Sequence, residues 1–349
     1  MKRRNFVYSL GLAGLSFPLS SFANNNNVKI PNSIKVPQRL LKGDTIGIIS
    51  PAGAIFESEP YQIAKETFEA MGLKVKMGKH VQGRYGHLAG TDVERAEELN
   101  SMFKDPEIKA IIALRGGSGS ARILDKVDYN TISQNPKIFI GYSDITALHL
   151  AIYEKTGLVT YHGPVATSNW NSFSYEHFRK LLFEGEEITY LNPESRNDLL
   201  VQTENRIRTI TPGEADGVLL GGNLSVLTSI IGTPYFPEAW KNKILYLEDI
   251  GEKVYAVDRM MSQLKLSEVL EQISGFVFGK CSGCDAGGSG YGSLTLEEVL
   301  DHYIKPLNIP AFSGAMIGHI DKNVTIPNGI EARINSKVGS IQLKTPAVK

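Results

Sequence analysis

Residues 138–148 read IFIGYSDITAL, and this stretch decides how the rest of the chain is interpreted. The apolar run 138–141 is typical of a buried strand in a parallel sheet, and the residues after the turn continue as a helix. Ser143 therefore stands on a strand-to-helix turn, the geometry of a nucleophile elbow, with its hydroxyl projecting above the sheet. The turn lacks the second glycine of the usual GxSxG pattern, because Ile145 stands there. The alternative is that Ser143 is the N-cap of the helix, with Thr146 at the third helical position.

The segments on either side of this stretch alternate between strand and helix patterns. Short β-branched runs end at glycine or proline, and between them apolar residues recur at helical spacing. Such alternation predicts a parallel sheet with helices on both faces, whose functional sites lie beyond the carboxyl ends of the strands. The predicted strands are 45–49, 73–77, 110–114 and 138–141, and the predicted helices are 61–71 and 91–103.

A second α/β unit follows a stretch in which the pattern weakens. Glycine, proline and polar residues gather over 186–213, and we predict a linker there. It separates an N-terminal α/β domain, residues 36–185, from a smaller C-terminal α/β domain, residues 214–345. We expect a flavodoxin-like or Rossmann-like parallel sheet in the first domain and the active site between the two. In the second domain we expect strands at 217–220, 244–247 and 275–278, helices from 223, over 256–266 and over 294–303, and a closing hairpin over 327–334.

The charge balance argues against polyanionic partners. The chain has 37 Lys and Arg residues and 37 Asp and Glu residues, so no net field would draw it onto nucleic acid or an anionic membrane. Nucleotide cofactors are not expected either. The glycine-rich residues 115–120 lack the GxxxxGK[ST] pattern of a phosphate loop, and residues 50–53 offer one glycine where the dinucleotide fingerprint has three. We therefore expect no cofactor.

The first 23 residues have the organisation of a secretory signal. Lys2, Arg3 and Arg4 form a charged region, an apolar stretch follows to Phe17, and Ala23 closes a segment suited to cleavage. The apolar stretch is shorter than the roughly 20 residues that a membrane-spanning helix needs. We expect cleavage after Ala23, export to the periplasm and no stable membrane insertion of the mature protein. Two alternatives stay open: a twin-arginine signal, which would export the folded protein, and an uncleaved N-terminal anchor.

Cys281 and Cys284 are the two cysteines of the chain. They cannot form a structural zinc site by themselves, because no second cysteine pair supplies the other two ligands, and we expect no metal. The residues after them, 285–290, have a loop composition rather than the helix that follows a redox CxxC motif. We favour two ordinary loop cysteines, with a short-loop disulfide as the alternative in an oxidising compartment.

A serine nucleophile needs a base, and the chain has seven histidines. His319 follows an apolar segment and Gly318, in a loop from which its ring could project, so it is the first candidate. His162 ends a strand at the same edge of the sheet and is the runner-up. His149 follows Ser143 in the same helix and would be carried away from it by the rise of about 1.5 Å per residue. The remaining histidines are expected at the surface: His80, His87, His177 and His302.

Two consecutive carboxylates are candidates for the acid that orients the base. Glu248 and Asp249 directly follow an apolar strand, where an unpaired charge is costly. A carboxylate in such a place can hold the tautomer of a base histidine and stabilise its imidazolium. The alternative is that both residues cap or charge the start of the next helix.

Backbone N–H groups near the serine could stabilise a developing oxyanion. Arg115, Gly116 and Gly117 end the third strand, and their glycines permit a close approach of the backbone, as an oxyanion hole or a phosphate cradle requires. The N–H of Asp144 lies at a helix start and can face the same point.

Seven short motifs in one order give the chain a family resemblance. They are ISPAG (49–53), LRGG (114–117), IGYSD (140–144), YHGP (161–164), LGGNL (220–224), LED (247–249) and GH (318–319). In this order they resemble the LD-carboxypeptidase family, which includes muramoyl-tetrapeptide carboxypeptidases and microcin-immunity peptidases. The likeness covers residues 36–343.

The resemblance implies a Ser-His-Glu triad divided between the two domains. Ser143 would be the nucleophile, His319 the general base and then the general acid, and Glu248 would orient the imidazole. The backbone N–H groups of Gly117 and Asp144 would form the oxyanion hole.

The implied activity is release of the C-terminal D-alanine from peptidoglycan tetrapeptide stems or muropeptides, through an acyl-enzyme. We assign Arg115 and Gly116 to substrate binding. Ser118 stands where family members often have an aromatic residue, a change expected to reshape the substrate groove. The resemblance also implies a homodimer, although no apolar stripe in the sequence identifies an interface.

Two other functions stay open. A peptidase of the microcin-immunity type would cleave a nucleotide conjugate and would profit from an aromatic clamp for the base, for which Trp170 is a candidate. A non-catalytic periplasmic binding protein also has two α/β domains around a cleft, but it needs no serine at a strand-to-helix elbow.

Overall fold

The computed structural model describes residues 33–195, 198–287 and 292–349. The predicted signal segment, residues 1–23, lies outside the described residues, as does the proposed cleavage after Ala23. Among the described residues, no helix has both the length and the apolar character needed to cross a membrane.

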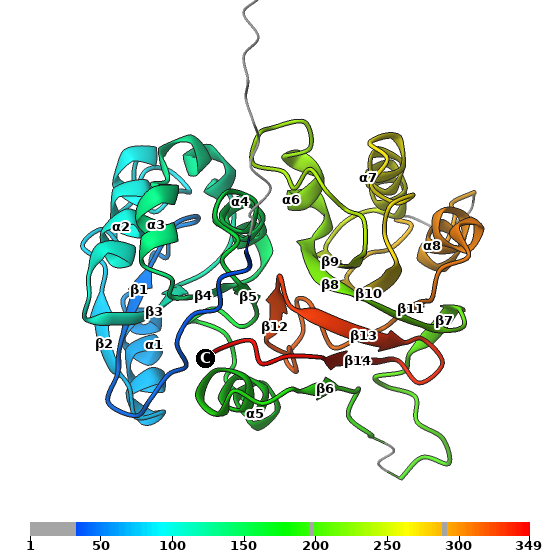
Figure 1. Ribbon diagram of the computed structural model, residues 1–349, viewed down its shortest axis with the longest axis horizontal. Coiled ribbons are helices and arrows are strands. Elements are labelled where there is room, and N and C mark those ends of the chain that lie inside the picture. The colour runs from blue at the N-terminus through cyan, green and yellow to red at the C-terminus, as the bar shows by residue number, and fades with distance from the viewer. Residues whose placement is uncertain (1–32, 196–197, 288–291) are drawn as a thin grey trace, which may run out of the picture. The chain divides into compact units, whose positions relative to one another are not determined.

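The first sheet is the predicted parallel sheet, in the order β12-β5-β4-β3-β1-β2 (Figure 1). The first five strands along the chain pair in parallel, and β12 adds to β5 in the antiparallel direction. The strands are β1 (Thr45–Ile49), β2 (Lys74–Met77), β3 (Ile108–Ala113), β4 (Ile138–Gly141), β5 (Thr160–His162) and β12 (Ile326–Asn328).

Helices cover both faces of this sheet, as the alternating pattern predicted. Alternate strand residues point to opposite faces, so Ile111 and Phe139 pack with α2, α3 and α4, whereas Ile112 and Ile140 pack with α1 and α5. The helices are α1 (Glu59–Ala70), α2 (Asp92–Lys104), α3 (Tyr129–Gln134), α4 (Thr146–Thr156) and α5 (Ser172–Arg179). Shorter helical turns are η2 (Ser120–Lys126), η3 (Ser143–Ile145) and η4 (Lys180–Glu184).

The second sheet has a parallel centre and antiparallel edges, in the order β6-β14-β13-β8-β9-β10-β11-β7 (Figure 1). Strands β8 to β11 run in parallel, and α6 to α8 pack on one face of them. The strands are β6 (Thr189–Tyr190), β7 (Arg208–Thr211), β8 (Glu214–Asn223), β9 (Lys243–Ile250), β10 (Gly275–Ser282), β11 (Ala311–Ser313), β13 (Glu331–Asn335) and β14 (Ser340–Leu343). The helices are α6 (Leu224–Ser229), α7 (Val254–Leu266) and α8 (Leu296–Ile304), followed by the turn η5 (Lys305–Leu307).

Helix starts follow the capping signals of the sequence. Thr91 accepts a hydrogen bond from the backbone N–H of Glu94, whose side chain returns to the Thr91 N–H, and this capping box begins α2. Thr295 and Glu298 form the same box at the start of α8. Local side-chain chemistry therefore sets these two boundaries.

The closing hairpin predicted over 327–334 is wrong. Strand β12 pairs with β5 of the first sheet, with Pro327 opposite Tyr161, whereas β13 pairs with β8 and β14 of the second sheet. Gly329, at a φ of 98°, lies between the two strands. An alternating pattern shows which residues are buried, but it does not show which sheet a strand joins.

The stretch 186–213, predicted as a linker, contributes β6 and β7 to the second sheet. Strand β6 pairs with β14, and β7 pairs with β11. Both are short edge strands in a polar, proline-containing segment, and such strands have little apolar pattern to reveal them.

The preferred prediction of two unpaired loop cysteines is also wrong. Cys281 lies in β10, opposite Asp249 of β9, because the strand extends beyond the apolar run 275–278. A turn then brings Cys284 back, and the two residues form a disulfide with their Cα atoms 5.3 Å apart.

Candidate active site

Ser143 adopts a left-handed backbone conformation, with a φ of 64° directly after β4. This region costs a non-glycine residue about 1–2 kcal/mol, and such strain is typical of functional sites. The alternative assignment of Ser143 as a helix N-cap is wrong, because Ile145 precedes α4 and no side chain caps that helix. Ser143 instead opens the turn η3, as a nucleophile elbow requires.

The loop after β3 supports this elbow from one side. A Cβ atom on Gly116 would lie 2.8 Å from the Cβ of Ser143, so only glycine fits there. The buried carboxylate of Asp144 accepts a hydrogen bond of 2.7 Å from the Ser120 N–H, and the Ser120 hydroxyl donates to the Asp144 carbonyl. Burial raises the pKa of Asp144 above its usual range. These contacts fix the turn that carries the serine.

The two N–H groups predicted for the oxyanion hole lie on this support. Gly117 has a φ of 116° and lines the same pocket as Ser143. Its N–H has no hydrogen-bond partner among the residues that the structure describes, and is thus free to bind an oxyanion. The Asp144 N–H lies in η3, directly after the serine. The roles of both groups stay predictions.

Glu248 and His319 form the second half of the site. Glu248 ends the apolar part of β9 and is fully buried, and its Oε2 atom accepts a hydrogen bond of 2.8 Å from Nδ1–H of His319. The imidazole is 14% exposed, so it reaches the pocket while its partner does not. Because Nδ1 is bound, Nε2 is the nitrogen that remains for a substrate or a serine.

The His319 loop is shaped to permit this contact. Gly318 has a φ of 130°, and a Cβ atom there would lie 3.0 Å from Oε2 of Glu248. The Ser282 hydroxyl donates to the His319 carbonyl at 2.7 Å, and the ring of Tyr142 lies 4.7 Å from the imidazole. Tyr142 precedes Ser143, so this aromatic contact joins the two halves of the site.

Asp249, the neighbouring carboxylate, has a different role. It accepts hydrogen bonds of 2.9 Å from the Asn223 side chain and from the backbone N–H groups of Ser225 and Ile250. Burial raises its pKa above the usual range. The capping alternative is wrong, because the helix that follows, α7, has Lys253 at its N-cap and no side chain caps it. Asp249 instead accepts the Ser225 N–H in the first turn of α6, whose N-cap is Asn223.

The other histidines are placed away from the pocket. His162, the runner-up base, is fully buried, and its Nε2 lies 3.9 Å from Oε1 of Glu248; neither ring nitrogen has a hydrogen-bond partner among the described residues. Burial lowers its pKa well below the usual range. His149 is also buried and donates to the Gly141 carbonyl at 2.8 Å. His177, against Tyr190, and His80 are half-buried and not at the surface as predicted, whereas His87 and His302 are exposed.

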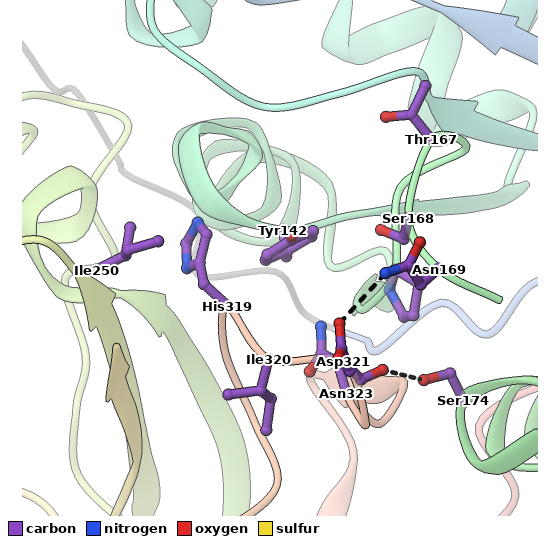
Figure 2. Close-up of a pocket in the computed structure, with 11 residues that line it drawn as sticks. Tyr142, Thr167, Ser168, Asn169, Ser174, Ile250, His319, Ile320, Asp321 and Asn323 are labelled. Carbon is purple, nitrogen blue, oxygen red and sulfur yellow. Dashed lines mark hydrogen bonds between the residues drawn. The ribbon is translucent and has the colours of Figure 1, made fainter. Parts of the chain in front are cut away.

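Two pockets share a wall at this site. One, of about 440 Å³, is lined by Ser143, His319, Arg115, Gly116 and Gly117. The other, of about 570 Å³, is shown in Figure 2 and extends from His319 toward Asp321. The residues common to both are Tyr142, Thr167, Ser168 and His319.

The pocket walls include residues that the sequence did not single out. Thr167, Ser168 and Asn169 follow the YHGP motif, and Asp321 follows His319. These segments are polar and have no periodic pattern, so nothing in the sequence indicated that they line a pocket. The fold brings them together. Ser118, expected to reshape the groove, lines neither pocket. Within the described residues, no group of three or more His, Cys, Asp or Glu side chains could hold a metal ion.

A serine on a strained elbow and a histidine held by a buried carboxylate, on two α/β sheets, are the features of the class of serine hydrolases. Two family models match the chain: the LD-carboxypeptidase N-terminal domain over residues 46–163 and the LD-carboxypeptidase C-terminal domain over residues 216–334. The chain belongs to the LD-carboxypeptidase family.

Individual relatives agree with this assignment. The chain is 40% identical over 304 residues to the probable murein peptide carboxypeptidase of Bacillus subtilis, covering 86% of this chain and 91% of the relative. Its structure is similar to muramoyltetrapeptide carboxypeptidase from Oxalobacter formigenes, with a TM-score of 0.73, 29% identity and coverage of 86% and 97%. It is also similar to the microcin C7 self-immunity protein MccF in complex with aspartyl sulfamoyl adenosine, with a TM-score of 0.82, 30% identity and coverage of 90% and 100%.

Proposed function

We propose that this protein is a serine LD-carboxypeptidase that releases the C-terminal D-alanine from peptidoglycan tetrapeptide stems or muropeptides. The observation that carries the proposal is the hydrogen bond from His319 to the buried Glu248, at the edge of the pocket that Ser143 lines. The relatives named for murein peptides and muramoyl tetrapeptides support the choice of substrate.

The reaction would proceed in two stages, acylation and deacylation, and in each stage His319 takes up one proton and gives one back. The Ser143 hydroxyl attacks the carbonyl of the L-configured centre while Nε2 of His319 takes its proton, and the N–H groups of Gly117 and Asp144 bind the oxyanion. When the C–N bond breaks, His319 gives the proton to the departing D-alanine amine. Water, deprotonated by His319, then attacks the acyl-enzyme, and the tripeptide leaves with a new carboxylate while Ser143 regains its proton. Glu248 holds the imidazole and stabilises its charged form throughout.

Arg115 and Gly116 would serve substrate binding. Arg115 is exposed in the serine pocket, where its Nη1 donates to the Ala54 carbonyl at 3.1 Å. A guanidinium held in this way can bind a carboxylate, and every substrate of a carboxypeptidase ends in one. Gly116 lets the backbone lie against Ser143, which leaves room for the peptide.

The test is mass-spectrometric. The mature protein and its Ser143→Ala variant are incubated with a muramyl tetrapeptide, and the product is weighed for loss of one D-alanine. Ser118→Ala, a neighbouring serine outside both pockets, is the control. Loss of D-alanine with the unaltered chain and the control, but not with Ser143→Ala, is expected. No loss with any of them, from folded protein, would contradict the proposal.

A second candidate function is cleavage of nucleotide conjugates, which the likeness to MccF favours. Trp170, the candidate for the aromatic clamp that this function would use, argues against it. Trp170 is half-buried, packs in edge contact with Phe68 and Phe178 with ring centroids 5.3 and 5.1 Å away, and lines neither pocket. Cleavage rates of aspartyl sulfamoyl adenosine and of the tetrapeptide distinguish the two candidate functions. Faster cleavage of aspartyl sulfamoyl adenosine would favour the second candidate. Labelling of Ser143 by an active-site serine reagent would exclude a purely binding role.

We also propose that the protein acts after export, on stems outside the inner membrane. The support is the charged and apolar segment at residues 2–17 and the cleavage signal that ends at Ala23. Fractionation of cells and N-terminal sequencing of the mature protein test this, with Asn24 expected as the first residue. Replacing Arg3 and Arg4 with lysine separates the two export routes, because only the twin-arginine route needs that pair. A homodimer, as the resemblance implies, is tested by light scattering of the mature protein.

A further inference from the structure

The pocket beside His319 has an acidic wall. Asp321 is the one carboxylate that lines it, and no lysine or arginine does so among the described residues. In Figure 2, Asp321 lies beside Asn169, with Ser174 directed toward it, while His319 and Tyr142 lie farther along the same pocket. The space of about 570 Å³ next to the histidine is large enough for an amino-acid side chain.

The position of Asp321 is fixed by contacts from the opposite wall. Its carbonyl accepts hydrogen bonds from the Asn171 side chain and from the Ser174 hydroxyl, the latter at 3.3 Å. Its Oδ1 atom accepts a hydrogen bond of 3.2 Å from the Asn169 side chain. These contacts come from the loop before α5 and from its first turn. Two of them position the backbone of Asp321 and the third positions its carboxylate before any ligand binds.

The adjoining pocket has the opposite charge. Arg115 is its one fully charged lining residue, beside Ser143 and Gly117. The ion pairs among the described residues include neither Arg115 nor Asp321. Because the two pockets share His319, this histidine adjoins one pocket lined by a cation and another lined by an anion.

This charge order sets the direction in which a peptide can lie. The leaving residue of a carboxypeptidase substrate has a terminal carboxylate, which Arg115 attracts and Asp321 repels. The residue that supplies the scissile carbonyl must then direct its side chain to the other side of His319, into the pocket with Asp321. A group of opposite charge at the end of that side chain would complete the pairing.

We propose that Asp321 forms a subsite for a cationic side chain, an ammonium group, on the residue that precedes the scissile bond. The inference rests on the proposed carboxypeptidase function and names the class of peptide that it takes. Lysine and diaminopimelate both carry such a group. Asp321 is exposed, so solvent screens the contact and its contribution is modest, about two- to fivefold in kcat/KM.

Three tetrapeptides that differ only in the third residue test the subsite. They contain lysine, Nε-acetyl-lysine or diaminopimelate; acetylation keeps the length of the lysine side chain and removes its charge. The mature protein is compared with Asp321→Asn, which keeps the shape of the side chain and removes its charge. Asp125→Asn is the matched control, because Asp125 is an exposed carboxylate on η2 that lines neither pocket.

The mature protein is expected to prefer the lysine peptide over its acetylated form about two- to fivefold. Asp321→Asn is expected to lose this preference by slowing cleavage of the lysine and diaminopimelate peptides, with the acetylated peptide unchanged. The faster of the two cationic peptides identifies the natural source of the ammonium group. High salt should reduce the preference of the mature protein and leave Asp321→Asn unaffected.

Equal rates on charged and acetylated peptides, or an Asp321→Asn variant that keeps the preference, would overturn the subsite while leaving the carboxypeptidase function intact. Failure of the mature protein to release D-alanine from any of the three peptides would instead remove the proposed function itself. Asp125→Asn is expected to match the unaltered chain on all three.

Discussion

The carboxyl end of β4 and the carboxyl end of β9 carry the two halves of the candidate site, and they are built by different means. At β4 the important feature is the backbone: Ser143 lies at a φ of 64°, against a glycine that leaves room for it. At β9 the backbone is ordinary strand, and the important feature is a carboxylate, Glu248, fully buried beside a histidine from a distant loop.

The contrast between Glu248 and its neighbour Asp249 shows how a carboxylate bound to a histidine differs from one that is surrounded by structural donors. The Oε2 atom of Glu248 binds His319, and its Oε1 has no hydrogen-bond partner among the described residues. Asp249 is surrounded by donors from Asn223, Ser225 and Ile250. A fully satisfied buried group stabilises the fold, whereas one aimed at a single histidine mainly positions that histidine.

The largest effect is expected at the elbow. Ser143→Ala should lower kcat by about 10⁴-fold or more, because the nucleophile is lost. Ser143→Gly should be equally inactive but more stable, by about 1 kcal/mol in the free energy of unfolding, because glycine adopts a positive φ without strain. Rates of D-alanine release and urea unfolding curves measure the two effects.

These two variants test different parts of the argument. Substantial activity in Ser143→Ala would end the assignment of the nucleophile. A glycine variant no more stable than the alanine variant would show that the elbow stores no strain. Gly116→Ala tests the glycine that supports the elbow. The new Cβ atom would clash with Ser143, so the substitution should lower both activity and stability.

At β9 the two carboxylates should separate activity from stability. Glu248→Gln keeps the side-chain volume but removes the charge that orients His319, so kcat should fall about 10²–10⁴-fold with little change in folding. In Asp249→Asn, one carboxylate oxygen becomes an NH₂ group, which cannot accept the hydrogen bonds that surround it. The free energy of unfolding should therefore fall by about 1–3 kcal/mol, with the folded fraction still active.

Steady-state kinetics and urea unfolding on both variants give the comparison. If Glu248→Gln stays active while Asp249→Asn does not, the roles of the two residues are exchanged. Equal losses of activity and stability in both would mean that the β9 end acts as one structural unit.

A smaller effect, dependent on pH, is expected behind the elbow. Burial lowers the pKa of His149 to about 4, from an ordinary value near 6.5. Below pH 6.5 the unfolded chain binds a proton that the folded protein takes up only near pH 4. The contribution of His149 to stability is therefore complete above pH 6.5 and is lost as the pH falls to 4, by about 3 kcal/mol.

His149→Gln isolates this contribution, because an amide can still donate to the Gly141 carbonyl but does not titrate. Urea unfolding between pH 4.5 and 7.5 should show a weaker pH dependence in the variant than in the unaltered chain. Identical slopes would mean that His149 is not buried in its neutral form. Lost activity at pH 7 is not expected, since the histidine contacts the end of β4 and not the pocket.

The smallest effect is expected at the disulfide beside the second half of the site. The double replacement of Cys281 and Cys284 by serine should lower the free energy of unfolding by about 2 kcal/mol, as estimated for a very short loop. Ser282, between them, donates to the His319 carbonyl, so kcat should fall less than in Glu248→Gln. Calorimetry with and without reductant measures the stability, and an unaltered melting temperature would contradict a closed disulfide.

Much of this arrangement could be predicted from local sequence. The run 138–148 predicted β4, the elbow and α4, because burial and helical spacing are expressed within a few neighbouring residues. The capping box at Thr91 set the start of α2 for the same reason. His319 and Glu248 were also named from the sequence, where the family resemblance joined two segments that no local rule connects.

Only the tertiary structure decided the rest, because the deciding contacts join residues far apart in the chain. Strand β12 crosses to the first sheet, and which of two adjacent carboxylates meets the histidine depends on the direction of each side chain along β9. The acidic wall at Asp321 exists only because Asn169 and Ser174 are folded against it. The sequence by itself determined the central strands, most helices and the candidate reactive residues, whereas long-range packing determined their partners and the edge strands, since a one-dimensional pattern records burial but not which surfaces meet.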